Sequence, residues 1–286
     1  MSQPDPQIQH LLLPSPEDPV HSLHLITSLL SPSECTSLIT SHTDLIPSNV
    51  TPGTIRTREQ FSDPKLAEEI WSRISEFYSG DRIQDEDGEW WRVKGLNYMF
   101  RLCKYESGLS PLSLFRFQFL GWADEITGGK FSAHFDGRRL EDLNTQSFLS
   151  VNIYLNTIPS TSCGSTRILK SPFQGETDTA PFPLPPVTPD QILFKIQPVL
   201  GTAAIFRDTV WHDGEELLGG EKFLLRTDVM YEREEEFDFE RLCQGLGDRE
   251  KGEKALGIAE GLEDAGNREE AVKWYKKAFR LCPEMG

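Results

Sequence analysis

Seven short segments with a two-residue hydrophobic period constrain the fold of this chain more than any other feature. They are rich in β-branched and aromatic residues and are separated by turn residues: YMFRLCKY (98–105), KFSAHFD (130–136), SFLSVNIYLN (147–156), TRIL (166–169), ILFKI (192–196), TAAIFR (202–207) and KFLLRTDVMY (222–231). Such segments are typical of strands, and many short strands in succession favour an antiparallel double-sheet jelly roll. We therefore expect an α+β protein with a jelly roll at its centre.

Two helical segments precede these strands. Residues 21–42 carry leucine and isoleucine at helical spacing, and the break SPSEC restarts the helix with Ser31 or Ser33 as its N-cap. The second segment begins at Asp63 and Pro64, which suit the N-cap and the first helical position. We expect these N-terminal helices to support the sheets.

The charge and the cysteine spacing exclude several classes of protein. The 286 residues include 45 acidic and 29 basic side chains, a net charge of −16 that disfavours nucleic-acid and anionic-membrane binding. There is no apolar run of 18 residues, and residues 1–22 read as a flexible tail without the basic region of a signal peptide. Five widely spaced cysteines without a C-x-x-C pair indicate reduced thiols. The expected location is cytoplasmic or nuclear.

The C-terminal segment differs from the rest of the chain. After an acidic stretch, residues 250–286 predict two helices joined near Gly266 and Asn267. Small and aromatic residues there match the spacing of a single tetratricopeptide repeat: Ala259, Gly266, Ala271, Tyr275, Ala278 and Pro283. One repeat cannot bury its own apolar face, so we expect the pair to pack on the main domain or on a protein partner. The alternative is a capping pair that only stabilises the fold.

A histidine and an aspartate lie two residues apart in GGKFSAHFDGRR (128–139). Apolar and polar residues alternate there, so His134 and Asp136 share one face of a predicted strand. The pair is either a half-solvated strand face or two ligands of one metal ion. A third candidate ligand, His212, follows the apolar strand that begins after Gly201. Two histidines and one carboxylate can form the facial triad that holds non-haem Fe(II) and leaves other coordination positions open.

Two basic residues lie on the strand after His212. Lys222 follows His212 by ten residues, and alternation places Arg226 on the same face. Burial of an unpaired charge is costly, so either an anion binds these cations or this face is solvated.

Six motifs occur in the order found in one known family: GLNYMFRLCKY, GGKFSAHFDG, SVNIYLN, CGSTRIL, VLGTAAIF and WHDGEELLGGEKFLLRTDVMY. On these motifs, residues 25–231 resemble the Fe(II)- and 2-oxoglutarate-dependent dioxygenases of the prolyl 4-hydroxylase type. The resemblance implies a double-stranded β-helix, the jelly roll of this family. It also implies a domain of residues 23–240 followed by the helix pair of residues 250–286.

The resemblance assigns roles to individual residues. His134, Asp136 and His212 match the iron ligands, and Tyr105 matches a tyrosine that lines the cosubstrate pocket. Lys222 matches the residue that grips the distal carboxylate of 2-oxoglutarate, while the role of Arg226 stays open. The implied reaction uses Fe(II), 2-oxoglutarate and O2, with ascorbate as a further reductant, and releases succinate and CO2 as the substrate is hydroxylated.

Two features depart from the family pattern. The usual glycine turn reads Gly164-Ser165-Thr166 after Cys163, and serine tolerates positive φ poorly, so we expect a reshaped turn. The second departure is the additional segment of residues 109–128, without which the family spacing is restored. This segment is either a retained intron in the gene model or a genuine lid.

Three functions remain open at this stage. The leading hypothesis is a dioxygenase acting on an amino acid, a peptide or a small molecule. A nucleic-acid demethylase with the same chemistry is disfavoured by the acidic charge. The third hypothesis is a catalytically impaired dioxygenase fold that acts as an interaction scaffold through its C-terminal helix pair.

Overall fold

The computed structural model describes residues 5–12, 22–48, 53–108, 128–171 and 186–285. The chain forms two compact units. Unit 1 comprises Met1–Ile74, Tyr98–Asp136 and Ser150–Thr227, and unit 2 comprises Ser75–Asn97, Gly137–Leu149 and Asp228–Gly286. Almost all of the additional segment predicted from the sequence, residues 109–127, lies outside the described residues.

The larger sheet of unit 1 contains most of the predicted strands. Its order is β1 (Gln7–Leu12), β2 (Ser22–Thr27), β13 (Ala203–Arg207), β10 (Thr145–Tyr154), β15 (Glu221–Arg233), β7 (Met99–Glu106), β4 (Thr57–Ser62) and β3 (Ile46–Pro47). The pairs β1–β2, β2–β13, β15–β7 and β7–β4 are antiparallel. Strands β10 and β15 each contribute residues to both units.

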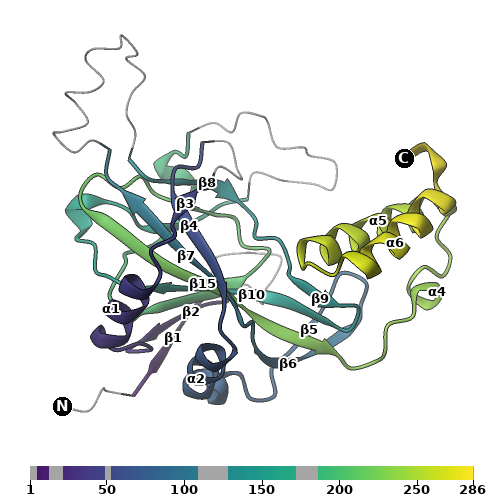
Figure 1. The fold of residues 1–286 in the computed structure, drawn as a ribbon, viewed down its shortest axis with the longest axis horizontal. Helices are drawn as coiled ribbons and strands as arrows, with labels where there is room; N and C mark the ends of the chain where they lie inside the picture. The colour runs from purple at the N-terminus through teal and green to yellow at the C-terminus, as the bar shows by residue number, and fades with distance from the viewer. Residues whose placement is uncertain (1–4, 13–21, 49–52, 109–127, 172–185, 286) are drawn as a thin grey trace, which may run out of the picture. The chain divides into compact units, whose positions relative to one another are not determined.

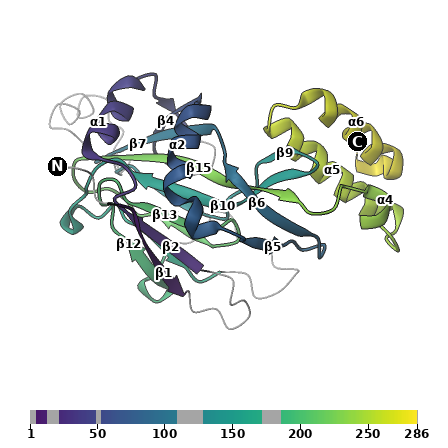
Figure 2. The ribbon, with the colours of Figure 1, turned by 90° about the horizontal axis from the view of Figure 1, so that it is seen from below.

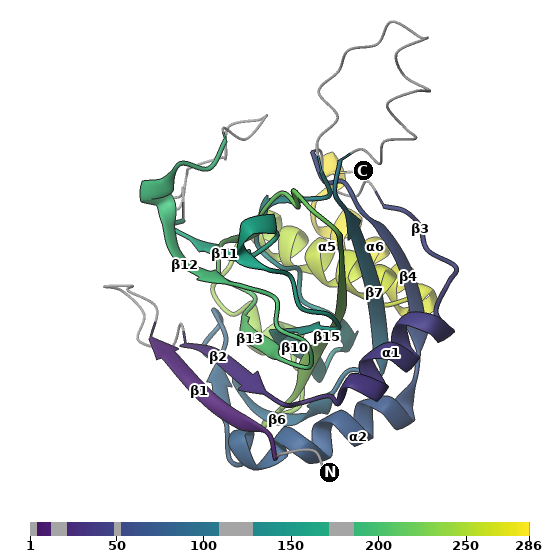
Figure 3. The same ribbon diagram turned by 90° about the vertical axis from the view of Figure 1, so that its left-hand side faces the viewer.

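The smaller sheet has the order β12 (Ile192–Ile196), β11 (Thr166–Leu169), β14 (His212–Gly214) and β8 (Phe131–His134), with antiparallel neighbours throughout. Figure 3 shows β11 and β12 opposite β4 and β7. A core cluster joins the inner faces of the two sheets, with side chains from β7, β10, β13 and β15 packed with Phe131, Ile168 and Ile196 of the smaller sheet. The predicted α+β jelly roll, a double-stranded β-helix, is thereby confirmed.

Two helices of unit 1 begin where the sequence predicts. Ser31 is the N-cap of α1 (Pro32–Ser41): its Oγ accepts a hydrogen bond from the Glu34 amide at 3.2 Å, and the Glu34 carboxylate accepts the Ser31 amide at 2.7 Å. This reciprocal capping box satisfies two amides that the helix itself leaves unpaired. Asp63 Oδ1 accepts the Leu66 amide at 3.0 Å at the start of α2 (Pro64–Ile74). The guanidinium of Arg73 pairs with Glu34 at 2.5 Å and ties the two helices together.

The N-terminal segments differ from the expectation in two places. Residues 22–27, predicted as helix, form β2, and residues 7–12 of the expected tail form β1. Strand β2 is paired on both sides, with His24 opposite His10 in β1 and opposite Ile205 in β13. Hydrogen bonding and burial in the sheet outweigh the helical spacing of the leucines, because secondary-structure propensity is weak relative to tertiary packing.

Unit 2 contains the short strands β5 (Arg82–Gln84), β6 (Trp90–Leu96) and β9 (Leu140–Asp142), and the helices α4 (Phe239–Leu242), α5 (Asp248–Asp264) and α6 (Arg268–Leu281). The remaining short helices of the chain are η1 (Ser75–Tyr78), η2 (Ser160–Ser162), η3 (Pro189–Gln191) and η4 (Pro283–Met285). Figures 1 and 2 show α5 and α6 side by side, with α4 and β9 nearby.

The predicted C-terminal helix pair is present and has its own core. Gly266 adopts φ +87° in the connection between α5 and α6, a conformation that favours glycine. Trp274 of α6 packs against Phe237 and Phe239 at ring-centroid distances of 5.6 and 5.2 Å. Leu140 of β9 packs against the same cluster, so the pair buries its apolar face within unit 2. None of the helices in the described ranges is long and apolar enough to cross a membrane.

Candidate metal centre

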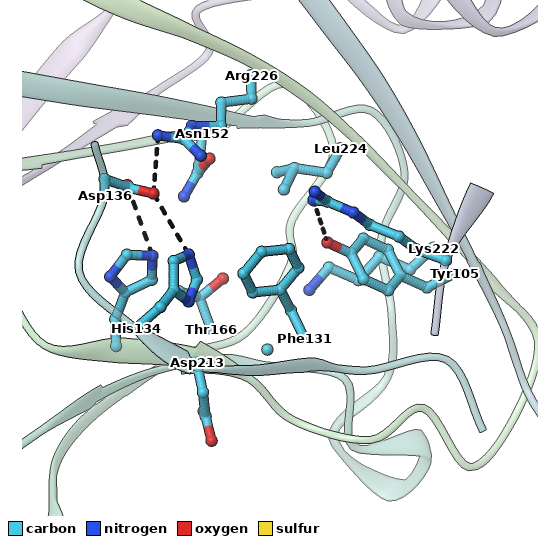
Figure 4. Close-up of a pocket in the computed structure, with 13 residues that line it drawn as sticks. Tyr105, Phe131, His134, Asp136, Asn152, Thr166, Asp213, Lys222, Leu224 and Arg226 are labelled. Atoms are coloured by element: carbon cyan, nitrogen blue, oxygen red, sulfur yellow. Dashed lines mark hydrogen bonds and ion pairs between the residues drawn. The ribbon is translucent and has the colours of Figure 1, made fainter. Parts of the chain in front are cut away.

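The pairing of β8 with β14 brings the three predicted metal ligands together. His134 ends β8, Asp136 follows two residues later, and His212 begins β14 directly opposite His134. One ligand atom from each of the three side chains lies within 4.8 Å of the other two. Figure 4 shows His134 and Asp136 side by side at one end of a cavity, which His212 also lines.

Both histidines present a lone pair to the aspartate. The Nδ1 of His134 lies 2.8 Å from the Ser132 carbonyl, and the Nδ1 of His212 lies 2.9 Å from the Val210 carbonyl. A carbonyl oxygen can only accept, so each Nδ1 carries the proton and each Nε2 is free to bind a metal. The Nε2 atoms lie 3.3 and 3.6 Å from the Asp136 carboxylate. Burial lowers the pKa of His212 to about 4, which favours the neutral, ligating form.

Asp136 is held in its ionised form by its neighbours. Burial by itself would raise the pKa of Asp136, but Arg226 and the two imidazoles hold it well below its usual range. Ser150 Oγ donates to Oδ2 at 2.6 Å, and the Arg226 guanidinium lies 2.7 Å from Oδ1. The Arg226 contact is an ion pair without hydrogen-bond geometry, so Oδ1 has no hydrogen bond within the described ranges. An anionic oxygen facing two imidazole lone pairs fits a divalent metal ion.

Lys222 lies at the other end of the same cavity, directly opposite Tyr105 in the β15–β7 register. The ammonium is 5.1 Å from the Tyr105 ring centroid and 5.8 Å from that of Tyr154. Its Nζ donates to the Gly164 carbonyl at 2.7 Å, and the described part of the chain places no carboxylate within ion-pair distance of it. Burial lowers the pKa of Lys222 to about 8. A buried ammonium with one hydrogen bond is costly unless an anion joins it.

The cavity is also lined by residues that the sequence did not single out: Arg56, Phe131, Asn152, Thr166, Asp213, Gly214 and Leu224. Asn152 shares its face of β10 with Ser150 and Tyr154, so the alternation in SVNIYLN contained a signal for it. Thr166 Oγ1 accepts a hydrogen bond from the Tyr154 hydroxyl at 2.9 Å. Arg56 lies before β4, far from the recognised motifs, and no local pattern marks it.

The turn beside Lys222 places its positive φ angles before Ser165, the residue for which the sequence raised the question. Positive φ occurs at Cys163 (56°) and Gly164 (75°), and not at Ser165. Cys163 therefore occupies a conformation that favours glycine. Ser165 is fully buried, and its Oγ donates to the Glu215 carboxylate at 2.5 Å. The turn still presents the Gly164 carbonyl to Lys222.

Comparisons with known proteins identify similar folds but no family. No protein-family model matches the chain, and no curated protein matches it. The viral collagen prolyl hydroxylase of Paramecium Bursaria Chlorella virus-1 is 16% identical, covers 73% of this chain and 95% of its own, and has a TM-score of 0.43. A prolyl-4-hydroxylase from Pseudomonas putida is 14% identical, with coverages of 76% and 94% and a TM-score of 0.43.

A third similar structure is a non-heme alpha-ketoglutarate-dependent carbocyclase from nogalamycin biosynthesis. It is 14% identical, with coverages of 74% and 80% and a TM-score of 0.47. All these identities are below 25% and all these TM-scores are below 0.5. The function proposed below therefore depends on the side chains of this chain, and the tetratricopeptide assignment of α5 and α6 remains a prediction.

Proposed function

We propose that this chain is an Fe(II)- and 2-oxoglutarate-dependent dioxygenase that hydroxylates an amino-acid, peptide or small-molecule substrate and releases succinate and CO2. The observation that carries the proposal is the convergence of His134 Nε2, His212 Nε2 and an Asp136 oxygen at one end of a cavity whose other end holds Lys222. A metal ion and a dicarboxylate of the right length would satisfy both ends at once.

His134, Asp136 and His212 would hold Fe(II), which supplies oxygen activation and the redox chemistry when bound. The carbonyl oxygens of Ser132 and Val210 fix the two ring orientations, and Ser150 orients the carboxylate. Groups of this kind tune the affinity of a site for its metal. The buried environment of Asp136 and His212 would keep bulk water away from the reacting centre.

Lys222 is the cation that we assign to the distal carboxylate of 2-oxoglutarate. Arg226 is already paired with Asp136, whereas among the residues that the structure describes Lys222 has the Gly164 carbonyl as its one hydrogen-bond partner. Arg226 would then position the metal-binding carboxylate, and Tyr105 would line the cosubstrate pocket through its ring. Ascorbate as a further reductant is part of the same proposal.

The test is an anaerobic titration of the purified protein with Fe(II) and then with 2-oxoglutarate. Chelation of the oxo acid by protein-bound iron gives a weak metal-to-ligand charge-transfer band in the visible spectrum. We expect a band that saturates in the wild type, is lost in Asp136→Ala and His212→Ala, and needs much more 2-oxoglutarate in Lys222→Ala. A matched control is Lys104→Ala on the neighbouring strand, whose ammonium pairs with Glu106 and Glu221 and does not line the cavity. Absence of the band from a folded wild-type protein would rule out the proposed function.

A further inference from the structure

A further basic side chain, Arg56, lines the cavity and has no assigned role. Its backbone is fixed on both sides: the Arg56 carbonyl accepts the Ser48 amide at 3.1 Å, and Ile55 exchanges two hydrogen bonds with Lys130. The Arg56 guanidinium lies 4.2 Å from the Phe131 ring centroid, and its NH1 is 3.5 Å from the Tyr105 hydroxyl. The arginine is therefore held in one place at the cavity wall.

Arg56 lacks an anionic partner within the described ranges. Its Nε is buried without a hydrogen bond there, and the carboxylates of those ranges all lie beyond ion-pair distance. The other arginine of the cavity is different, because Arg226 pairs with Asp136. Arg167, beside the cavity, forms a bidentate pair with Asp213. A guanidinium presents its donors in a planar fork that matches a carboxylate, so Arg56 is suited to bind one.

The position of Arg56 separates it from the end of the cavity that holds Lys222. Arg56 reaches the hydroxyl of Tyr105, whereas the Lys222 ammonium lies over the ring and donates to Gly164. The Phe131 ring under Arg56 lies 4.0 Å from the His134 ring, so a single aromatic ring separates Arg56 from a proposed metal ligand. Two cations that approach Tyr105 from different sides would bind two different anionic groups.

The charges of the cavity lead to the same conclusion. Asp136 is balanced by Arg226, and Asp213 by Arg167. A divalent metal ion and the dianion of 2-oxoglutarate would balance each other, which leaves the positive charges of Lys222 and Arg56 in excess. Buried or half-buried charge in excess is unfavourable in a medium of low dielectric constant. An anionic substrate would reduce this excess.

Besides Arg56 Nε, a second buried polar atom without a hydrogen bond belongs to a residue that lines the cavity. Asn152 is 5% exposed, and its Oδ1 has no hydrogen bond among the residues that the structure describes. A buried amide oxygen in this state needs a donor, since leaving it unpaired costs free energy. A ligand that satisfies both atoms carries an acidic group for Arg56 and an N–H or O–H group for Asn152.

We infer that the primary substrate is a carboxylic acid, also bearing an N–H or O–H donor, whose carboxylate binds Arg56. This inference rests on the proposed function, because Arg56 is left to a substrate only if the metal ion and 2-oxoglutarate occupy the sites at His134 and Lys222. It narrows the substrate class to compounds with a free carboxylate, which includes amino acids, hydroxy acids and acidic peptides.

The experiment uses acetate as the probe and acetamide as its neutral isostere. Each is titrated into the anaerobic protein–Fe(II)–2-oxoglutarate complex at constant ionic strength, and the charge-transfer band is recorded. We expect acetate, and not acetamide, to shift the band saturably in the wild type. Arg56→Gln should weaken the acetate effect by about tenfold or more, the usual loss when a hydrogen bond to a charged group is removed. Arg56→Lys, which keeps the positive charge, should retain part of the effect.

Arg58→Gln is the matched control, because it removes the same charge two residues away and Arg58 does not line the cavity. It should bind acetate like the wild type. The inference is wrong if the band forms but acetate leaves it unchanged, or if Arg56→Gln responds like the wild type.

Two further outcomes distinguish the sources of the carboxylate. Loss of 2-oxoglutarate affinity in Arg56→Gln, with pyruvate binding retained, would assign Arg56 to the distal carboxylate of the cosubstrate and overturn the inference. An acetate effect that added 2-oxoglutarate reverses would overturn it as well. If the wild type forms no band at all, the proposed function itself fails, which is a separate result.

Discussion

The affinity for 2-oxoglutarate should depend on the protonation of Lys222. Burial lowers the pKa of this ammonium to about 8, and Gly164 supplies its single hydrogen bond. In the proposed function the distal carboxylate of 2-oxoglutarate would bind the ammonium and not the neutral amine, so binding should compete with deprotonation. Two other groups of the cavity titrate outside the range from pH 7 to pH 9. Burial raises the pKa of Tyr105 to about 12, and burial lowers that of His212 to about 4.

The size of the effect follows from the pKa. Lys222 is about nine-tenths protonated at pH 7 and about one-tenth protonated at pH 9, so the apparent affinity should fall about tenfold over this range. The bound carboxylate favours the charged form and raises the pKa of Lys222 in the complex. Binding at pH 8 should therefore take up about half a proton for each 2-oxoglutarate.

Anaerobic calorimetry on the Mn(II)-loaded protein measures both quantities. Titrations at pH 7, 8 and 9 give the affinity, and two buffers with different ionisation enthalpies give the proton uptake at pH 8. Lys222→Arg keeps its charge throughout this range and should bind with an affinity that is independent of pH. Pyruvate, which has no distal carboxylate, should show no dependence in the wild type.

Constant wild-type affinity from pH 7 to pH 9 would refute this account of Lys222. A slope that persists in Lys222→Arg would show that the titrating proton belongs to another group. In either case the distal carboxylate would have to be assigned to a different cation, and Arg56 would be the next to test.

Three other predictions test the site and unit 2. Lys222→Met should stabilise the ligand-free protein against urea by up to about 3 kcal/mol at pH 7, because the variant no longer buries an ammonium. Between about pH 8 and 10.5 the unfolded wild-type chain binds more protons than the folded one, so the gain should fall through this range and vanish above it. Lys104→Met should show no gain. Ser150→Ala removes the hydrogen bond to Asp136 and should weaken Mn(II) binding by about 10- to 100-fold in calorimetry, whereas unchanged affinity would exclude an orienting role. Trp274→Ala should cost about 3–5 kcal/mol and raise hydrogen exchange in α5 and α6, and unaltered exchange there would contradict the packing described for unit 2.

The sequence predicted those elements whose signals are local. The N-cap at Ser31 and the Asp63-Pro64 helix start depend on side chains within three residues of the backbone groups that they satisfy. The central strands were also predictable, because alternation survives when one face of a strand is buried. Strand β2 was not predictable, because its conformation depends on partners almost 180 residues away in β13 as well as on β1.

The residues of the candidate site likewise include some that a local sequence pattern identifies and others that only the fold brings together. His134 and Asp136 lie two residues apart at the end of β8, and the alternation of the sequence there marks them as candidates before any fold is known. Arg56 precedes β4 and Asn152 belongs to β10, and only the folding of the sheets brings them to one cavity. An arginine at a strand entrance looks like many surface arginines in a sequence, and its lack of a carboxylate partner is a property of three-dimensional packing.

The assignment of the two cations of β15 shows what the fold adds to alternation. Alternation places Lys222 and Arg226 on the same face, and by that criterion either could hold the distal carboxylate. Four residues of extended strand separate the two Cα atoms by about 13 Å, so the side chains reach opposite ends of the cavity. The ion pair with Asp136 fixes Arg226 at the metal end, and the Gly164 carbonyl fixes Lys222 at the other. A five-carbon dicarboxylate bound at the metal end would extend away from Arg226 towards Lys222, and on this ground we propose Arg226 as a support for the metal ligand and Lys222 as the anchor of the cosubstrate.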